Sequence, residues 1–293
     1  MQYRLWQVVS ALIRRVPPRA SYAIAVVAGS AAFYCWPRGR RATIRNYRQV
    51  LAGAPPSEIR RTARRSLVNY CKYLTDFVRF PSLPAAMLIE QVLGGERFAE
   101  LDRALAEGKG AIIVCTHFGN WDLGAGATAA RGFPLTVLAE TFGDPRLDEM
   151  VVGARKRLGM EVIKIEKAGP SLMRTLQRNG LLALLIDRPM PGDGVTVRFF
   201  GAEVEVPAGP ARLALSTGAA VVSVAFPRVE PGAPTVTTLA EFLPRHSPTG
   251  DQAADVTAIT QAIVSSHEAF IRRHPDQWYM FREMWPKPAT AAL

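Results

Sequence analysis

A short apolar run constrains the fold of this chain more than any other stretch. Residues 110–114 read Gly-Ala-Ile-Ile-Val, so the run is uncharged and rich in β-branched side chains. Such a run is typical of a strand buried on both faces, as in a parallel sheet covered by helices. Residues 115–125 follow directly and read Cys-Thr-His-Phe-Gly-Asn-Trp-Asp-Leu-Gly-Ala. We expect the functional site there, because ligands of open α/β sheets bind at the carboxyl ends of the strands.

Two residues after this strand could carry chemistry. His117 and Asp122 are five positions apart, which on a helix would place them on different faces, so a loop must bring them together. Gly119 and Asn120 favour a turn, and Asn120 suits the N-cap of a helix starting near Trp121. Asp122 could then accept a hydrogen bond from one imidazole nitrogen and leave the other as a base. On the local pattern alone, a histidine that only packs remains an equal alternative.

Beyond this loop, strand-like and helix-like patterns alternate, which predicts a largely parallel sheet. The expected fold class is α/β, a single domain with a mostly parallel central sheet flanked by helices. A helix over 96–107 should lead into the central strand, and 195–206 should form a hairpin around Gly201. The further strands are expected at 135–139, 161–165, 181–186, 220–226 and 235–242, and the further helices at 145–158, 171–178, 208–217 and 253–273.

The first quarter of the chain has a charge pattern of its own. Residues 1–75 hold thirteen arginines and Lys72 against one acid, Glu58, whereas 24 of the 25 acidic side chains lie further on. The arginines alternate with apolar runs and not with the stacking aromatics of a nucleic-acid module, so no nucleic-acid partner is expected. Apolar surface beside arginine is typical of binding to an anionic membrane surface. We therefore predict a membrane-associating helical segment over 1–75 and the α/β domain over 76–293, with solvated charge as the alternative.

Four helices are expected in this quarter, at 1–16, 20–36, 41–51 and 56–80. The first is amphipathic, with apolar residues at 5, 8, 9, 12 and 13. The second carries no charge but would span only about 26 Å, less than the ~30 Å hydrocarbon core. This length favours a helix that packs on the domain or lies in the membrane interface. A marginal transmembrane helix is the alternative, and a cleaved signal peptide is opposed by the arginines at 38, 40 and 41.

The cysteine and histidine patterns indicate neither disulfides nor a metal. Cys35, Cys71 and Cys115 are widely spaced, so a reducing compartment is expected and no zinc framework. His267 precedes a glutamate but lacks the second histidine of HExxH. No GxSxG elbow and no Walker A loop occurs. Cys115 continues a buried strand, which favours a packed thiol over a nucleophile.

The stretch His-Phe-Gly-Asn-Trp-Asp, at 117–122, resembles the HxxxxD signature of the glycerolipid acyltransferase superfamily. Residues 117–126, HFGNWDLGAG, are similar to the branch that contains the lipid A late acyltransferases and the phosphatidylinositol mannoside acyltransferase. The His-Pro-Asp-Gln at 274–277 resembles the His-Pro-x-Gln ending of this branch. The chain lacks the EGTR block of the glycerol-phosphate acyltransferases, and this difference favours a sugar hydroxyl as acceptor.

The resemblance implies an acyltransferase that moves a fatty acyl group from acyl-CoA or acyl carrier protein to a glycolipid hydroxyl. The acceptor would be phosphatidylinositol mannoside-like or lipid A-like, and no cofactor beyond the acyl donor would be needed. The enzyme would act at the cytoplasmic face of the plasma (inner) membrane, peripherally or with one marginal transmembrane helix. A thioester or lipid hydrolase and a non-catalytic membrane-binding protein remain the alternative interpretations.

The resemblance also suggests roles for individual residues. His117 would be the general base, oriented by Asp122 or by Glu140, which ends the strand at 135–139. The oxyanion would be held by backbone N–H groups of the Gly119-Asn120 turn or by an arginine. The expected catalytic residues are therefore His117, Asp122 and Glu140, and the expected substrate-binding residues are Asn120, Arg155, Asp187 and Arg188. The structural alternatives are a solvated helix face for Arg155, a helix cap for Asp187 and a surface arginine for Arg188.

Overall fold

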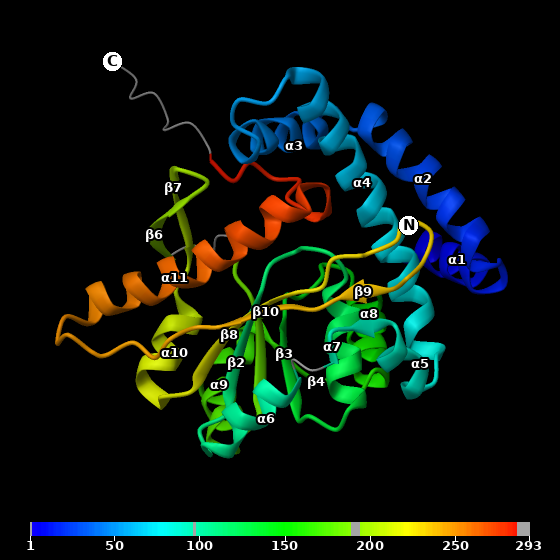
Figure 1. Ribbon diagram of the computed structural model, residues 1–293. Coiled ribbons are helices and arrows are strands. Elements are labelled where there is room, and N and C mark those ends of the chain that lie inside the picture. Colours follow the sequence, from blue (N-terminus) through cyan, green and yellow to red (C-terminus); the bar gives the residue numbers. More distant parts are fainter. Residues whose placement is uncertain (1, 96–97, 189–193, 286–293) are drawn as a thin grey trace.

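A six-stranded sheet lies at the centre of the described part of the chain, which in this computed structural model comprises residues 2–95, 98–188 and 194–285 (Figure 1). Its strand order is β10-β8-β2-β5-β3-β4, and only the edge strand β10 runs antiparallel to its neighbour. The predicted α/β fold with a mostly parallel central sheet is confirmed. The strands are β2 (Ala111–Cys115), β3 (Leu135–Ala139), β4 (Glu161–Lys164), β5 (Leu181–Leu185), β8 (Ala220–Ala225) and β10 (Leu239–Phe242).

Helices cover both faces of this sheet, so β2 is buried throughout, as its apolar run predicts. Side chains alternate along a strand. Ile112 and Val114 pack into a core with α9, α10 and α11, while Ala111, Ile113 and Cys115 pack into a second core with α6 and α7. The helices are α5 (Ala85–Glu90), α6 (Phe98–Ala106), α7 (Trp121–Ala130), α8 (Pro145–Arg157), α9 (Ala168–Gln177), α10 (Gly209–Thr217) and α11 (Gln252–Arg273).

The four expected helices of the first quarter are present as α1 (Gln2–Arg15), α2 (Pro18–Cys35), α3 (Pro37–Val50) and α4 (Pro56–Arg79). The boundary predicted between residues 75 and 76 lies inside α4. Tyr73 and Asp76 on this helix are buried against the loop that follows β2. The last helix of the basic quarter therefore helps to build the site at the end of the sheet.

Helix α2 packs on α4, and Ala25 and Gly29 are among its buried residues. A Cβ atom at Gly29 would come within 2.5 Å of the Val68 Cα atom, so only glycine allows this approach. The opposite face of α2 exposes Ile24 and Val27. Within the described residues, none of the helices alone has the length and apolar composition of a membrane span, but α2 and α3 meet these criteria as a pair bent by 95°.

Two regions differ from the sequence prediction. The strand expected over 235–242 is divided, because β9 (Val236–Thr237) pairs with β1 (Val92–Leu93) while β10 pairs with β8. Helix α5 and strand β1 were not expected, since such short elements carry too few residues to show a period. The hairpin is confirmed as β6 (Gly194–Phe199) and β7 (Ala202–Pro207), with Phe200 and Gly201 at positive φ in the turn.

Candidate active site

The loop between β2 and α7 is held in one conformation by close backbone contacts. Gly119 has a φ of 64°, and a Cβ atom there would lie 2.1 Å from the carbonyl oxygen of Phe226. Only glycine fits this position. Asn120 is the N-cap of α7, since its side-chain oxygen accepts from the backbone N–H of Leu123 at 3.2 Å. The predicted turn and cap are both present.

His117 lies at the end of β2 and faces a carboxylate from the neighbouring strand. Its Nδ1 is 2.7 Å from Oδ1 of Asp187, and its backbone N–H donates to Oδ2 at 2.9 Å. The indole N–H of Trp278 donates to Oδ2 at 3.0 Å. Burial would raise the pKa of Asp187, but the charge of His117 and these hydrogen bonds lower this pKa to about 2. An ionised Asp187 assigns the proton to Nδ1 and leaves Nε2 as a base.

Asp122 makes no hydrogen bond or ion pair with His117, so the expectation that it would orient the imidazole is corrected. Arg155 donates to both oxygens of Asp122, at 2.8 and 3.2 Å, and Tyr73 donates to Oδ2 at 2.7 Å. The carboxylate sits in the first turn of α7 and is directed toward α4 and α8. Burial would lower the pKa of Arg155, but the charge of Asp122 and its hydrogen bonds raise it.

Glu140 and Arg188 pair with each other at the rim of the site. Arg188 donates to Glu140 at 3.3 Å, and the glutamate side chain is 58% exposed. Glu140 follows β3, and β5 lies between β3 and β2. Strands are about 4.8 Å apart, so the end of β3 is about 10 Å from the end of β2. The acid from the adjacent strand, Asp187, is the one that reaches His117.

A buried ion pair behind the loop fixes Asn120. Asp76 accepts from the side-chain nitrogen of Asn120 at 3.1 Å, from Tyr22 at 2.5 Å and from Arg228. Both polar atoms of the Asn120 side chain are thus used within the protein. Sequence reasoning missed Asp76 and Arg228. The sequence does contain a signal for Asp76, because it is one of only two acids among the first 80 residues and lies on the apolar face of a helix.

The segment after α11 closes over the other side of the loop. The backbone N–H of Tyr279 donates to the carbonyl of His117 at 2.7 Å, and that of Gly119 donates to the carbonyl of Gln277 at 2.9 Å. The backbone N–H of Asn120 donates to Phe226 at 2.8 Å. The turn N–H groups expected to hold an oxyanion are therefore already occupied. The His-Pro-Asp-Gln ending was noted in the sequence, but its contact with this loop was not predicted.

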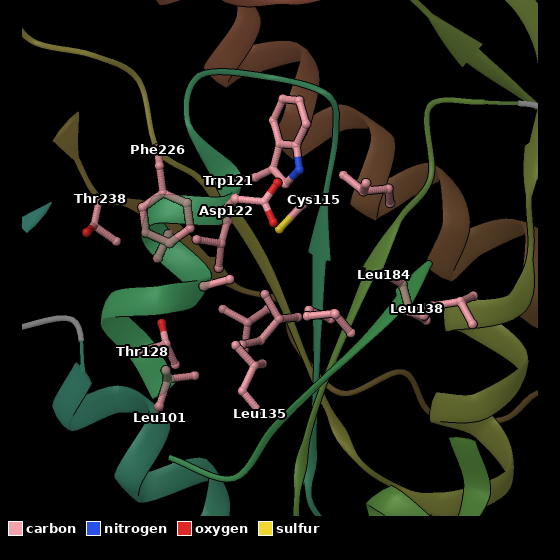
Figure 2. A pocket seen from close by; sticks show the side chains of 18 of the residues that line it. Leu101, Cys115, Trp121, Asp122, Thr128, Leu135, Leu138, Leu184, Phe226 and Thr238 are labelled. Atoms are coloured by element: carbon pink, nitrogen blue, oxygen red, sulfur yellow. The ribbon is translucent and has the colours of Figure 1, made fainter. Parts of the chain in front are cut away.

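An apolar cavity of about 70 Å³ opens beside the loop, between one face of the sheet and helices α6 and α7 (Figure 2). Trp121, Asp122 and Cys115 lie at one end of it, while Leu101 and Leu135 lie at the other (Figure 2). Burial raises the pKa of the Cys115 thiol to about 12, so this thiol stays protonated at neutral pH. Among the described residues, no group of three or more histidine, cysteine or acidic side chains is placed to hold a metal ion. The lining of the cavity is suited to an apolar ligand.

Comparison with known proteins gives matches over most of the chain. The family model described as bacterial lipid A biosynthesis acyltransferase matches residues 2–287. The chain is 31% identical over 288 residues to the phosphatidylinositol mannoside acyltransferase of Mycolicibacterium smegmatis, which covers 94% of this chain and 88% of that protein. It is 30% identical over 262 residues to the phosphatidylinositol mannoside acyltransferase of Mycobacterium tuberculosis strain H37Rv, with 82% and 75% covered. The resemblance seen at 117–126 extends over nearly the whole chain.

Proposed function

This chain belongs to the bacterial lipid A biosynthesis acyltransferase family, and from that premise we propose that it moves a fatty acyl group from acyl-CoA or acyl carrier protein to a sugar hydroxyl of a glycolipid. Membership makes the protein an O-acyltransferase with an acyl donor and a glycolipid acceptor. The nature of the donor, the histidine mechanism and the membrane association belong to the proposal. The observation that carries it is the buried His117–Asp187 pair beside Trp121, which lines the apolar cavity.

In the proposed reaction, Nε2 of His117 takes the proton of the acceptor hydroxyl while the hydroxyl oxygen attacks the thioester carbonyl carbon. The negative Asp187 stabilises the imidazolium that forms. The carbon–sulfur bond then breaks, and the leaving thiolate takes the proton from Nε2. The products are an ester and a free thiol, so no covalent enzyme intermediate and no cofactor is required. The protonated state of Cys115 supports direct transfer.

The apolar lining of the cavity supports a fatty acyl donor. Its lining comes mainly from α6, α7 and the strands β2, β3, β5, β8 and β10, and most of these side chains are apolar. Each methylene group moved from water into such a lining gains about 0.8 kcal/mol. An acyl chain inserted from the end at Trp121 leaves its thioester close to His117. The relatives named phosphatidylinositol mannoside acyltransferase favour a mannosylated phosphatidylinositol as acceptor over lipid A.

We place the enzyme peripherally on the cytoplasmic face of the plasma membrane. Val8, Leu12 and Val27 on α1 and α2 are 67%, 54% and 70% exposed, and exposed arginines flank them at positions 4, 15 and 19. Apolar side chains beside arginines suit the surface of an anionic bilayer. The three cysteines are all free, which agrees with a reducing compartment. Co-sedimentation with vesicles, with and without anionic lipid, tests this placement.

The proposed activity is tested by thiol release from palmitoyl-CoA or an acyl carrier protein thioester, with and without a polar lipid extract, followed by mass spectrometry of the lipids. We expect thiol release to need both His117 and the extract, and one glycolipid to gain an acyl mass. His246→Ala is the matched control, because His246 pairs with Asp255 in a loop far along the chain from the site. Equal release by wild type and His117→Ala would reject the mechanism. Free fatty acid released at full rate without the extract would favour a hydrolase.

A further inference from the structure

One buried hydrogen-bond donor beside the cavity has no acceptor. The indole nitrogen of Trp121 is shielded from solvent and has no partner among the described residues. Trp121 is the first residue of α7 and follows the N-cap Asn120, so its backbone position is fixed by that cap. Buried polar groups are nearly always paired, and an unpaired one is commonly explained by a bound group that completes it.

The ring of Trp121 is held by its aromatic neighbours. It stacks on Tyr73 with the ring centroids 4.1 Å apart, and it meets the His117 imidazole edge to face at 5.3 Å. The ring centroid of Tyr279 lies 6.1 Å from that of Trp121. Tyr73 is itself anchored through its hydrogen bond to Asp122. The indole N–H therefore has a fixed direction, and in Figure 2 it lies on the ring edge drawn toward Asp122 and Cys115.

Several other donors around this end of the cavity already have partners. The guanidinium of Arg155 is bonded to Asp122. The hydroxyls of Thr128 and Thr238, which also line the cavity, donate to backbone carbonyls. The backbone N–H groups of Gly119 and Asn120 donate to Gln277 and Phe226. Among the described side chains that line the cavity, the indole nitrogen of Trp121 is the buried polar atom that has no hydrogen-bond partner, so a ligand oxygen can accept from it.

We propose that the indole N–H of Trp121 donates a hydrogen bond to the carbonyl oxygen of the acyl thioester and holds the oxyanion that forms there. This inference rests on the proposed acyl transfer. The reacting carbonyl must lie where the acyl chain leaves the apolar cavity and within reach of the hydroxyl that His117 deprotonates. Trp121 lines the cavity and contacts His117, so it lies next to both the acyl chain and the general base.

The transfer proceeds by addition to the carbonyl and then loss of the thiolate. The acceptor oxygen adds to the carbonyl carbon, and the carbonyl π electrons move onto its oxygen, which becomes the oxyanion held by Trp121. The proton of the acceptor goes to Nε2 of His117. When the carbonyl re-forms, the carbon–sulfur bond breaks and the thiolate takes that proton. A donor that is stronger toward the oxyanion than toward the neutral carbonyl lowers the barrier of this step.

The test is Trp121→Phe, which keeps an aromatic ring on Tyr73 and removes the N–H. Loss of one oxyanion donor lowers kcat by about 10²-fold, and we expect this loss with little change in KM for the thioester. The melting temperature should stay the same or rise, since an unpaired buried donor is removed. Trp285→Phe is the matched control, because Trp285 also has a buried, unpaired indole nitrogen, here packed against Phe199 in the core. We expect it to leave kcat unchanged.

A second measurement reads the hydrogen bond without turnover. A palmitoyl thioester with a ¹³C-labelled carbonyl is bound to His117→Ala, and its carbonyl infrared band is recorded. Adding Trp121→Phe should move this band to higher frequency, whereas adding Trp285→Phe should not. Unchanged kcat and an unchanged band in the Trp121 variants would overturn the inference while the proposed function stands. If wild type neither transfers nor binds the thioester, the proposed function fails first.

Discussion

The loop after β2 is held between two buried carboxylates that have different partners. On the strand side, Asp187 contacts the His117 ring and Trp278. On the helix side, Asp122 is bonded to Arg155 and Tyr73 and makes no hydrogen bond to the imidazole. The first carboxylate acts on a side chain that can exchange a proton, while the second joins α7 to α4 and α8. Equal burial therefore does not mean an equal role, because the identity of the partner decides what a carboxylate does.

Asp187→Asn should have the largest effect on activity. Asparagine keeps the shape but removes the charge that fixes the Nδ1 proton and stabilises the imidazolium, a loss of about 10³ to 10⁴-fold in kcat by analogy with other histidine–carboxylate pairs. The measurement is kcat for thiol release with a saturating glycolipid extract. Circular dichroism of the same preparation checks that the variant is folded. Activity near the wild-type level in a folded variant would show that Asp187 does not orient the base.

Asp122→Asn should affect stability more than chemistry. It leaves the buried guanidinium of Arg155 without its charge partner, and breaking a buried pair costs about 3–5 kcal/mol. Urea unfolding measures the loss. Arg178→Ala is the comparison, because Arg178 and Glu161 form a pair that is more than half exposed on both sides and should contribute less than about 1 kcal/mol. A larger loss in kcat than in Asp187→Asn would reverse the roles assigned to the two carboxylates.

The ionised Asp187 should also make the stability of the fold depend on acid pH. The pKa of Asp187 is about 2 in the folded chain, against 3.8 as the ordinary value. A lowered folded pKa stabilises the fold above the ordinary value, and this contribution, about 2 kcal/mol, is lost as the pH falls from about 4 to 2. The free energy of unfolding measured over this range should fall less steeply for Asp187→Asn than for wild type. Parallel curves would mean that the carboxylate is not ionised by its neighbours.

The difference between the two carboxylates also marks how far the sequence could predict this molecule. The apolar runs and their alternation with helix patterns gave β2, β3 and β5 with nearly correct ends. Asp122, five residues from His117, was the nearest acid in the sequence, whereas Asp187 is 70 residues away. The register pairs Cys115 with Leu185, so the next residues of β2 and β5 place His117 level with Asp187.

Strand order was the missing information. The alternating pattern predicts that strands are parallel, but it does not state which strands are neighbours. The contacts of Asp76 with Arg228 and of Trp278 with Asp187 were also beyond the sequence pattern, because each joins segments that are far apart in the chain. A buried acid on an apolar helix face indicates that a partner exists, but the sequence does not show which residue it is.

Glu140→Gln should have the smallest effect. The Arg188–Glu140 pair lies at the rim, and the glutamate side chain is largely exposed, so we expect a stability change below about 1 kcal/mol. Its effect on kcat should be smaller than that of Asp187→Asn, because β5 separates β3 from β2. A cycle of Glu140→Gln, Arg188→Ala and the double variant, read as KM for the donor and the acceptor, shows whether the pair acts on substrate. A kcat loss equal to that of Asp187→Asn would return Glu140 to the role in orienting His117 that the sequence suggested.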